Sequence, residues 1–176
     1  MFYPSVNSTG GAAMTDWAGY TMTIRASSVN PTKGATIVRD NAFWRQVGDS
    51  IEVRYQYHHT AAGTAGTGQY LFNLPNNYVI DSSKIAVQGA SIDFIHSADS
   101  WGTASNAANG NDPSSQPIVM AVYSSTLVSF FRQPDSAGVQ TSQLAPIDST
   151  VYPLSEAVII YNFRFSLPIV GLTANV

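Results

Sequence analysis

Residues 43–57 read Phe-Trp-Arg-Gln-Val-Gly-Asp-Ser-Ile-Glu-Val-Arg-Tyr-Gln-Tyr, and the rest of the fold can be built outward from them. From Ser50 onward apolar and polar residues alternate, which predicts a strand with one buried face. Gly48-Asp49 lies between two runs that favour β-structure, and glycine in the first loop position suits a two-residue type II′ turn. The stretch therefore predicts a β-hairpin.

A two-residue loop also sets the register of this hairpin, and both faces agree with it. Trp44 then lies opposite Val53 and shares an apolar face with Val53 and Tyr55. On the other face Arg45 lies opposite Glu52, an opposite-charge pair that contributes roughly 0.2–1 kcal/mol. One register satisfies the apolar and the charged face together, which favours the hairpin over an irregular loop.

The composition indicates a folded domain with few charges. The chain has 176 residues, enough for one domain with its own core. It is 44% hydrophobic and 11% aromatic but only 11% charged, against a usual charged share of about a quarter. The net charge is −3, with eight lysines and arginines and no basic stripe. We therefore expect neither a nucleic-acid partner nor an anionic membrane partner.

Several classes of structure are excluded or not indicated. The chain has no cysteine, which excludes disulfides and thiolate zinc sites and leaves the redox compartment open. The first seven residues, Met-Phe-Tyr-Pro-Ser-Val-Asn, lack the basic and apolar regions of a signal peptide. No window approaches the roughly 18 consecutive apolar residues of a membrane span.

The remaining pattern predicts an all-β protein. We expect an antiparallel β-sandwich of about eight strands, with the jelly roll as its architecture. Residues 15–176 form the jelly-roll domain, and residues 1–14 form an extended N-terminal arm that is too small and polar to fold alone. Loops are expected at 60–68, 97–116 and 133–150. Further strands are predicted at 17–25, 36–39, 69–74, 85–95, 118–123, 127–132 and 156–167.

The histidines and the longest predicted loop are candidate metal-binding sites. His58 and His59 are adjacent, so on a strand they point to opposite faces, and His96 ends another predicted strand. Polar strand ends explain them better than a shared metal. Calcium is an alternative in loop 97–116, although the spacing does not match an EF-hand and the same residues favour turns. We assign no metal ligand and no cofactor. The oxygen-bearing residues of that loop are Asp99, Asn106, Asn109, Asn111 and Asp112.

Enzyme signatures are missing from the sequence. There is no Gly-x-Ser-x-Gly elbow, no P-loop and no dinucleotide fingerprint. Asp49 and Glu52 resemble a carboxylate pair, but the hairpin places Asp49 in the turn and Glu52 beside Arg45. We predict a non-enzymatic protein, with cleavage of host glycans by carboxylates that meet across subunits as the alternative.

Aromatic residues are the better functional signal. Nine tyrosines and three tryptophans exceed what one small core needs, and these residues are enriched at interfaces. We expect several of them between the subunits of a homotrimer, because long strands with few charges would otherwise leave apolar faces in water. The predicted trimer interface consists of Val53, Tyr55, Tyr57, Val158 and Ile160.

A resemblance adds to this interpretation. Asn-Ala-Phe-Trp-Arg-Gln-Val-Gly-Asp-Ser-Ile-Glu-Val at 41–53 and Gly-Thr-Gly-Gln-Tyr-Leu-Phe-Asn-Leu-Pro at 66–75 are similar to a pattern that recurs in virion proteins encoded by tailed phages. Residues 14–20, 80–81, 84–85 and 165–171 continue it, whereas Leu172 stands where that pattern often has tryptophan. The resemblance implies a virion accessory protein with a trimeric jelly roll of the tumour-necrosis-factor or complement-head type. It implies no catalytic residues.

Two binding roles follow from the resemblance. A capsid decoration (cement) protein on the capsid exterior is favoured, because only a short arm precedes the first strand and a compact trimer gains avidity from weak contacts. Its partners would be its own copies and the major capsid protein or other virion proteins. The predicted capsid anchors are Phe2, Tyr3, Trp17 and Tyr20. The alternative is the receptor-binding tip of a tail fibre or tail spike, with loops 97–116 and 133–150 contacting host-surface glycan.

Overall fold

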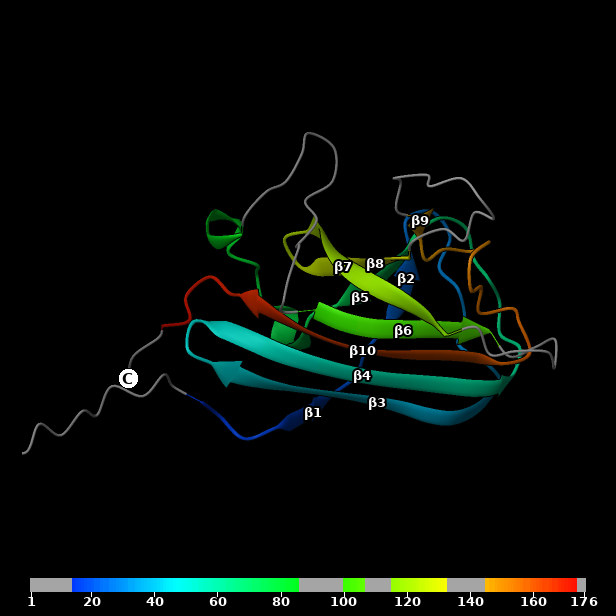
Figure 1. Cartoon of the computed structure of the whole chain (residues 1–176), viewed down its shortest axis with the longest axis horizontal. Coiled ribbons are helices and arrows are strands. Elements are labelled where there is room, and N and C mark those ends of the chain that lie inside the picture. The colour runs from blue at the N-terminus through cyan, green and yellow to red at the C-terminus, as the bar shows by residue number, and fades with distance from the viewer. Residues whose placement is uncertain (1–13, 86–99, 107–114, 133–144, 174–176) are drawn as a thin grey trace, which may run out of the picture.

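The chain folds into one antiparallel sheet. A computed structural model describes residues 14–85, 100–106, 115–132 and 145–173 (Figure 1). The strands are β1 (Ala18–Tyr20), β2 (Ile24–Ala26), β3 (Thr36–Val47), β4 (Ser50–Ala61), β5 (Tyr70–Asn73), β6 (Ser100–Asn106), β7 (Gln116–Ser124), β8 (Leu127–Arg132), β9 (Ala145–Pro146) and β10 (Ile159–Pro168). Two 3₁₀ turns, η1 (Pro75–Asn77) and η2 (Ser82–Lys84), are the helical segments of these ranges. None of the described residues belongs to a helix of membrane-spanning length and hydropathy.

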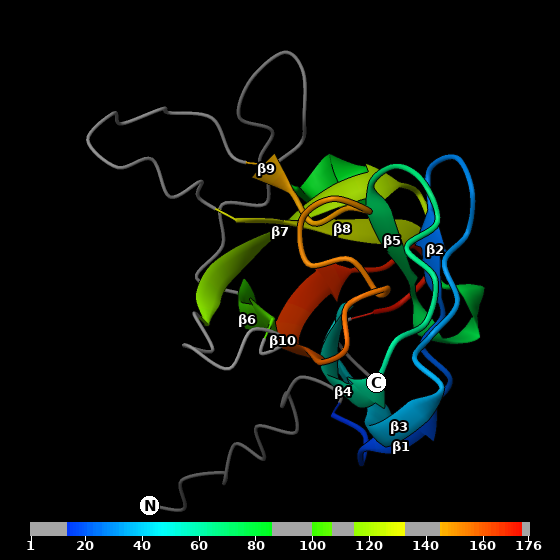
Figure 2. The same cartoon turned by 90° about the vertical axis from the view of Figure 1, so that its right-hand side faces the viewer.

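The sheet is curled into two layers that enclose the core. The strand order is β1-β3-β4-β10-β6-β7-β8-β5-β2, with β9 paired to β8. Figures 1 and 2 show β3, β4, β10 and β6 in one layer and β7, β8, β5 and β2 in the other, with the bend between β6 and β7. This is an all-β, jelly-roll-like antiparallel sandwich, which confirms the predicted fold class. The described residues form ten strands, whereas about eight were predicted.

The β3–β4 hairpin has the predicted register. Trp44 pairs with Val53 and Arg45 with Glu52. The guanidinium of Arg45 donates to Oε2 of Glu52 from Nε at 2.8 Å, and Nη2 lies 2.7 Å from the same oxygen. Gly48 has a φ of +64° at the turn, the conformation that required glycine there.

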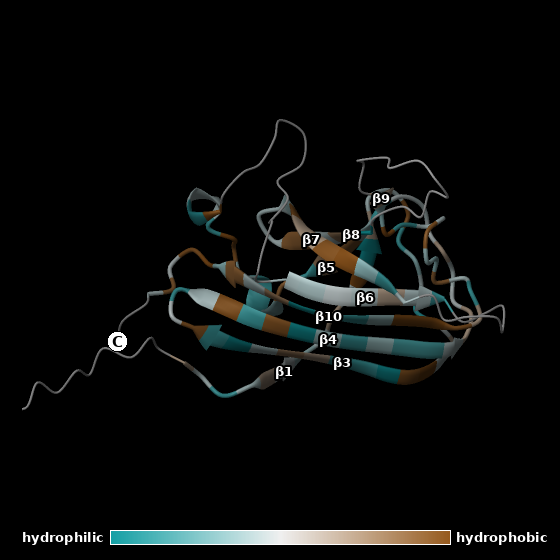
Figure 3. Cartoon of the chain, viewed as in Figure 1, coloured by the Kyte–Doolittle hydropathy of each residue, from teal (hydrophilic) through white to brown (hydrophobic). Residues whose placement is uncertain are grey.

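The core lies between the inner faces of the two layers. Alternation along β4 and β10 buries every second side chain, and Figure 3 shows the hydropathy alternating along β4. Phe163 of β10 lies at the centre, with ring centroids 4.0 Å from Phe130 of β8 and 5.2 Å from both Tyr55 of β4 and Phe72 of β5. Aromatic contacts therefore join strands that are far apart in the sequence.

The predicted strand 17–25 is wrong, because the structure splits it. β1 pairs with β3 at one edge of the sheet, whereas β2 pairs with β5 at the other edge. The chain crosses between the two layers around Met22, whose side chain is buried in the core. Alternation alone could not show this, because the pattern continues through the crossing.

The predicted loop 97–116 is also wrong in part, because β6 occupies Ser100–Asn106 and β7 begins at Gln116. β6 is rich in small residues for a steric reason. A Cβ at Gly102 would lie 2.6 Å from the Cβ of Phe163 and 2.8 Å from Cγ1 of Ile118. The large side chains of β10 and β7 fill this space, so β6 needs small inward residues.

Other predicted elements are confirmed or lie outside the described residues. Strands 69–74, 118–123, 127–132 and 156–167 correspond to β5, β7, β8 and β10, and strand 36–39 is the first part of β3. β4 extends to Ala61, two residues into the predicted loop 60–68. Residues 1–13, nearly all of strand 85–95 and most of loop 133–150 lie outside the described ranges.

Candidate functional site

The outward side of β3, β4, β10 and β6, here called the outer face, carries an ordered set of polar and aromatic residues. The pairing register places Phe43, Arg54, Arg164 and Trp101 side by side in one row across the four strands. Phe43 and Trp101 are large aromatic residues on this face, and they are 45% and 54% exposed. Arg54 and Arg164 lie between them and are both exposed. We call this set the arginine row.

Two neighbouring rows flank the arginine row. On one side Arg45 and Glu52 pair across the hairpin, and Ser166 lies beside Glu52. On the other side Asn41, Gln56 and Asn162 form an amide row on the same three strands. The outer face therefore offers hydrogen-bond donors and acceptors on both sides of two arginines.

Trp17, just before β1, covers one side of the arginine row. The Cζ atoms of Arg45 and Arg54 lie 4.7 Å and 4.3 Å from the centre of its ring. A guanidinium over an aromatic face is held electrostatically and loses side-chain freedom. Trp17 thus orients both arginines.

The positive charge of this face is only partly compensated. Arg45 is neutralised by Glu52, whereas the described residues place no carboxylate in an ion pair with Arg54 or Arg164. These two arginines lie directly opposite each other on neighbouring strands, where like charges disfavour folding. An anion bound between them would relieve this repulsion.

Two hollows open on the outer face on either side of the arginine row. One, of about 370 Å³, is lined by Trp17, Arg45 and Glu52 among others. The other, of about 380 Å³, is lined by Phe43, Trp101 and the amide row. Arg54 and Arg164 line both. These volumes fall in the range of sites for small ligands.

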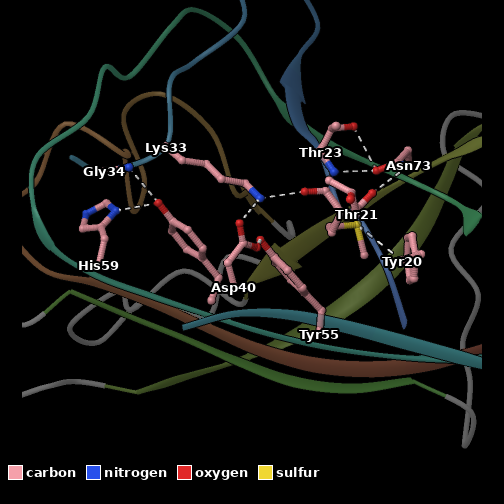
Figure 4. Close-up of polar contacts among 11 residues, drawn as sticks. Tyr20, Thr21, Thr23, Lys33, Gly34, Asp40, Tyr55, His59 and Asn73 are labelled. Carbon is pink, nitrogen blue, oxygen red and sulfur yellow. Dashed lines mark hydrogen bonds and ion pairs between the residues drawn. The ribbon is translucent and has the colours of Figure 1, made fainter. Parts of the chain in front are cut away.

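A second polar cluster, around Lys33, lies on the inward side of β3 and β4, where Lys33 is half-buried and Asp40 is exposed, and its role is structural (Figure 4). The ammonium of Lys33 donates to Oδ2 of Asp40 at 2.6 Å and to the carbonyl of Met22 at 2.7 Å. The hydroxyl of Tyr55 donates to Oδ1 of Asp40 at 2.9 Å. The cluster ties the segment before β3 and the Met22 crossing to β3 and β4.

The tautomer of buried His59 follows from its neighbours. The hydroxyl of Tyr57 accepts from the N–H of Gly34 at 2.8 Å, so its own proton is donated to Nδ1 of His59 at 2.8 Å. Nε2 then donates to the carbonyl of Glu156 at 3.0 Å. Burial lowers the pKa of His59 and raises the pKa of Tyr57 to about 12, so both stay neutral near pH 7.

His59 should make stability depend on pH. Its folded-state pKa lies below the unfolded value of about 6.5, so the unfolded chain binds more protons as the pH falls. The free energy of unfolding is therefore expected to be constant above about pH 7 and to decline as the pH drops through about 6.5. Urea unfolding between pH 7.5 and 5 measures this.

Two variants separate His59 from other groups. His59→Gln should lose the decline between pH 7 and 5, whereas His58→Gln, at the neighbouring position on the opposite face, should keep it. An unchanged slope in His59→Gln would contradict the assignment. The exposed carboxylates of Asp49 and Asp81, whose pKa values are lowered chiefly by hydrogen bonds from Lys84 and Ser83 respectively, titrate below this window.

The predicted trimer-interface residues need a correction. Val53, Tyr55 and Tyr57 point inward from β4 and are fully buried in the core of a single chain, so they cannot contact another subunit. Val158 and Ile160 are half-buried and keep some accessible surface. For these two residues the interface stays a prediction.

The predicted anchors lie in different surroundings. Trp17 belongs to the outer face. Tyr20 packs against the core, donates its hydroxyl proton to the sulfur of Met22 at 3.6 Å, and has a pKa raised by burial. It is therefore not a free anchor. Phe2 and Tyr3 lie outside the described residues.

The residues weighed as metal ligands are not brought together in the described ranges. His58 is half-buried on the outer face of β4, and His59 faces the core. Asn106 ends β6. His96, Asp99, Asn109, Asn111 and Asp112 lie outside the ranges that the structure describes. Within those ranges no three histidine, aspartate or glutamate side chains form a group that could hold a metal ion.

The two carboxylates weighed as a catalytic pair are each held by a cation. Asp49 accepts from Nζ of Lys84 at 2.7 Å, and Glu52 accepts from Arg45. Both contacts connect neighbouring segments of the fold. Sequence reasoning missed the arginine row itself, although the alternation along β4 and β10 had placed Arg54 and Arg164 on polar faces.

Comparison with protein-family models, curated proteins and solved structures finds no match for this chain.

Proposed function

We propose that this chain is a non-enzymatic structural protein of a phage particle that acts by binding, as a homotrimeric capsid decoration (cement) protein. The observation that carries the proposal is the outer face, which exposes two uncompensated arginines on a protein of net charge −3. A rigid sheet that presents fixed guanidiniums suits docking on the carboxylates of a neighbouring protein.

The homotrimer is supported by apolar surface on both layers. Val119 and Tyr123 project outward from β7 and are 39% and 47% exposed. The half-buried Val158 and Ile160 lie just before and at the start of β10, with Ile160 on the outer face on the same side as Asn162 and Arg164. Three-fold association joins different surfaces of neighbouring copies, so it would cover apolar side chains from both layers.

A second candidate function is receptor binding at the tip of a tail fibre or spike. The two hollows favour it, because both have the size of small-ligand sites. The hollow of about 380 Å³ also combines the exposed rings of Phe43 and Trp101 with amide side chains. A flat protein partner needs no such hollows. The outer face, rather than the predicted loops 97–116 and 133–150, would then carry the receptor contacts.

Electron microscopy of the particle tests the proposal. The expected result is density of this chain repeated over the capsid shell as three-fold-symmetric units. A few trimers at the tail would defeat the decoration role and favour receptor binding. Density of single, separate copies would contradict the homotrimer in either role.

A further inference from the structure

We propose that the outer face binds a saccharide that carries a carboxylate, with Arg54 and Arg164 holding the carboxylate and Trp101 stacking on the sugar ring. This inference rests on the second candidate function and names its ligand class. The site is the hollow of about 380 Å³ over the arginine row and the amide row.

The charge argument comes first. Arg54 and Arg164 are paired across β4 and β10, so their Cβ atoms lie about 4.5–5.5 Å apart. The guanidinium groups of two neighbouring arginines can both reach one carboxylate and donate to its two oxygens in planar, charge-assisted hydrogen bonds. Glu52 does not supply this carboxylate, because Arg45 already donates to it.

The aromatic residues supply the second part of the site. Trp101 is the neighbour of Arg164 in the same row, and Phe43 is the neighbour of Arg54 at its other end. Both residues are about half exposed, at 45% and 54%, and neither belongs to the core cluster. An exposed ring beside a charged group suits a ligand with one apolar face and one ionic group, which describes a sugar acid.

The amide row supplies the third part. Asn41, Gln56 and Asn162 each carry both a donor and an acceptor, which matches hydroxyl groups of a sugar. Gln56 is steadied by Arg39, whose Nη1 donates to its side-chain carbonyl at 3.1 Å. The row lies directly beside the arginine row, so a ring bound through its carboxylate would present its hydroxyls there.

Other ligand classes fit less well. A nucleic-acid backbone needs a run of cations along its phosphates, whereas this face has two uncompensated guanidiniums at one point. An acidic protein segment, the partner that the decoration role requires, would pair with the arginines but has no ring of hydroxyl groups to match Trp101 and the amide row.

The test is a titration followed by the indole N–H signals of the protein in NMR. The three tryptophans of the chain are Trp17 and Trp101 at the outer face and Trp44 on the inner face, whose ring contacts Tyr78 with centroids 5.3 Å apart. The probes are glucuronic, galacturonic and mannuronic acid. Each is compared, in a separate titration, with the corresponding neutral hexose and with its 6-phosphate. A polyglutamate peptide represents acidic protein.

The expected result is a saturable shift of the Trp101 signal with at least one hexuronic acid while Trp44 stays unmoved. The matched neutral hexose should bind about tenfold more weakly or worse, because it lacks the charge-assisted hydrogen bonds. Arg164→Gln should weaken binding of the acid about tenfold, whereas Arg25→Gln, at an exposed position on β2, should leave it unchanged.

Several outcomes would overturn the proposal: no shift of Trp101 with any hexuronic acid, equal binding of the neutral hexose, tighter binding of the phosphate, or tighter binding of polyglutamate at equal carboxylate concentration. If no sugar acid binds while Arg164→Glu still abolishes attachment to particles or cells, the ligand class is wrong and the binding surface stands.

Discussion

Replacing Phe163 by alanine is expected to lower the free energy of unfolding by about 3–5 kcal/mol. The side chain is 2% exposed, and its ring packs against rings of β4, β5 and β8. Removing it leaves a cavity between the two layers that the rigid strands cannot close. Urea unfolding followed by circular dichroism measures the loss.

Phe43→Ala is the matched control for this prediction. The same residue type is removed, but Phe43 lies on the outer face and is 45% exposed, so the expected cost is about 0.5 kcal/mol or less. If Phe163→Ala cost no more than Phe43→Ala, the core would not lie between β10 and the opposite layer.

The hairpin and the last strand could be predicted because the alternation of apolar and polar residues is visible within each segment alone. Residues 43–57 agree with one register on both faces, and Phe163 and Phe165 alternate with Asn162 and Arg164. Burial follows such alternation wherever one face of a strand meets a core. These two strands, β4 and β10, pair along their length at the centre of one layer.

β6 could not be predicted, because its small residues are required by side chains that are distant in the sequence. Gly102 and Ala104 are small because β10 places Phe163 and Tyr161 opposite them. A run of small and polar residues looks like a loop when its partners are unknown. Because this strand was predicted to be a loop, Trp101, the main aromatic residue of the candidate site, was not predicted to lie on the outer face.

The trimer-interface prediction failed for Val53, Tyr55 and Tyr57 for a related reason. Val53, Tyr55 and Tyr57 form an apolar face on a long strand, and both a core and a subunit interface exclude water from such a face. The sequence alone does not distinguish the two. The arginine row was missed because it depends on β4 lying next to β10, a pairing between segments about a hundred residues apart.

Arg164→Glu is expected to weaken attachment of the protein to its binding partner by about a hundredfold or more. The change removes charge-assisted hydrogen bonds, which contribute about 1.5–3 kcal/mol each, and adds repulsion of the same anion. The fold should be unaffected, because Arg164 is exposed and the described residues give it no ion-pair partner. A new pair with Arg54 would, if anything, stabilise the sheet.

Arg25→Glu is the matched control. It changes the net charge by the same amount at an exposed position on β2, in the other layer. A general effect of net charge on adsorption would therefore act equally on both variants. Only a specific role of the outer face separates them.

The most direct test of the outer face as the recognition surface is to measure how tightly the wild-type, Arg164→Glu and Arg25→Glu proteins bind to particles depleted of this chain and, separately, to host cells. We predict that Arg164→Glu loses one of these two attachments while Arg25→Glu binds like the wild type. If Arg164→Glu bound both the particles and the host cells as tightly as the wild-type protein, a binding role for the outer face would be contradicted.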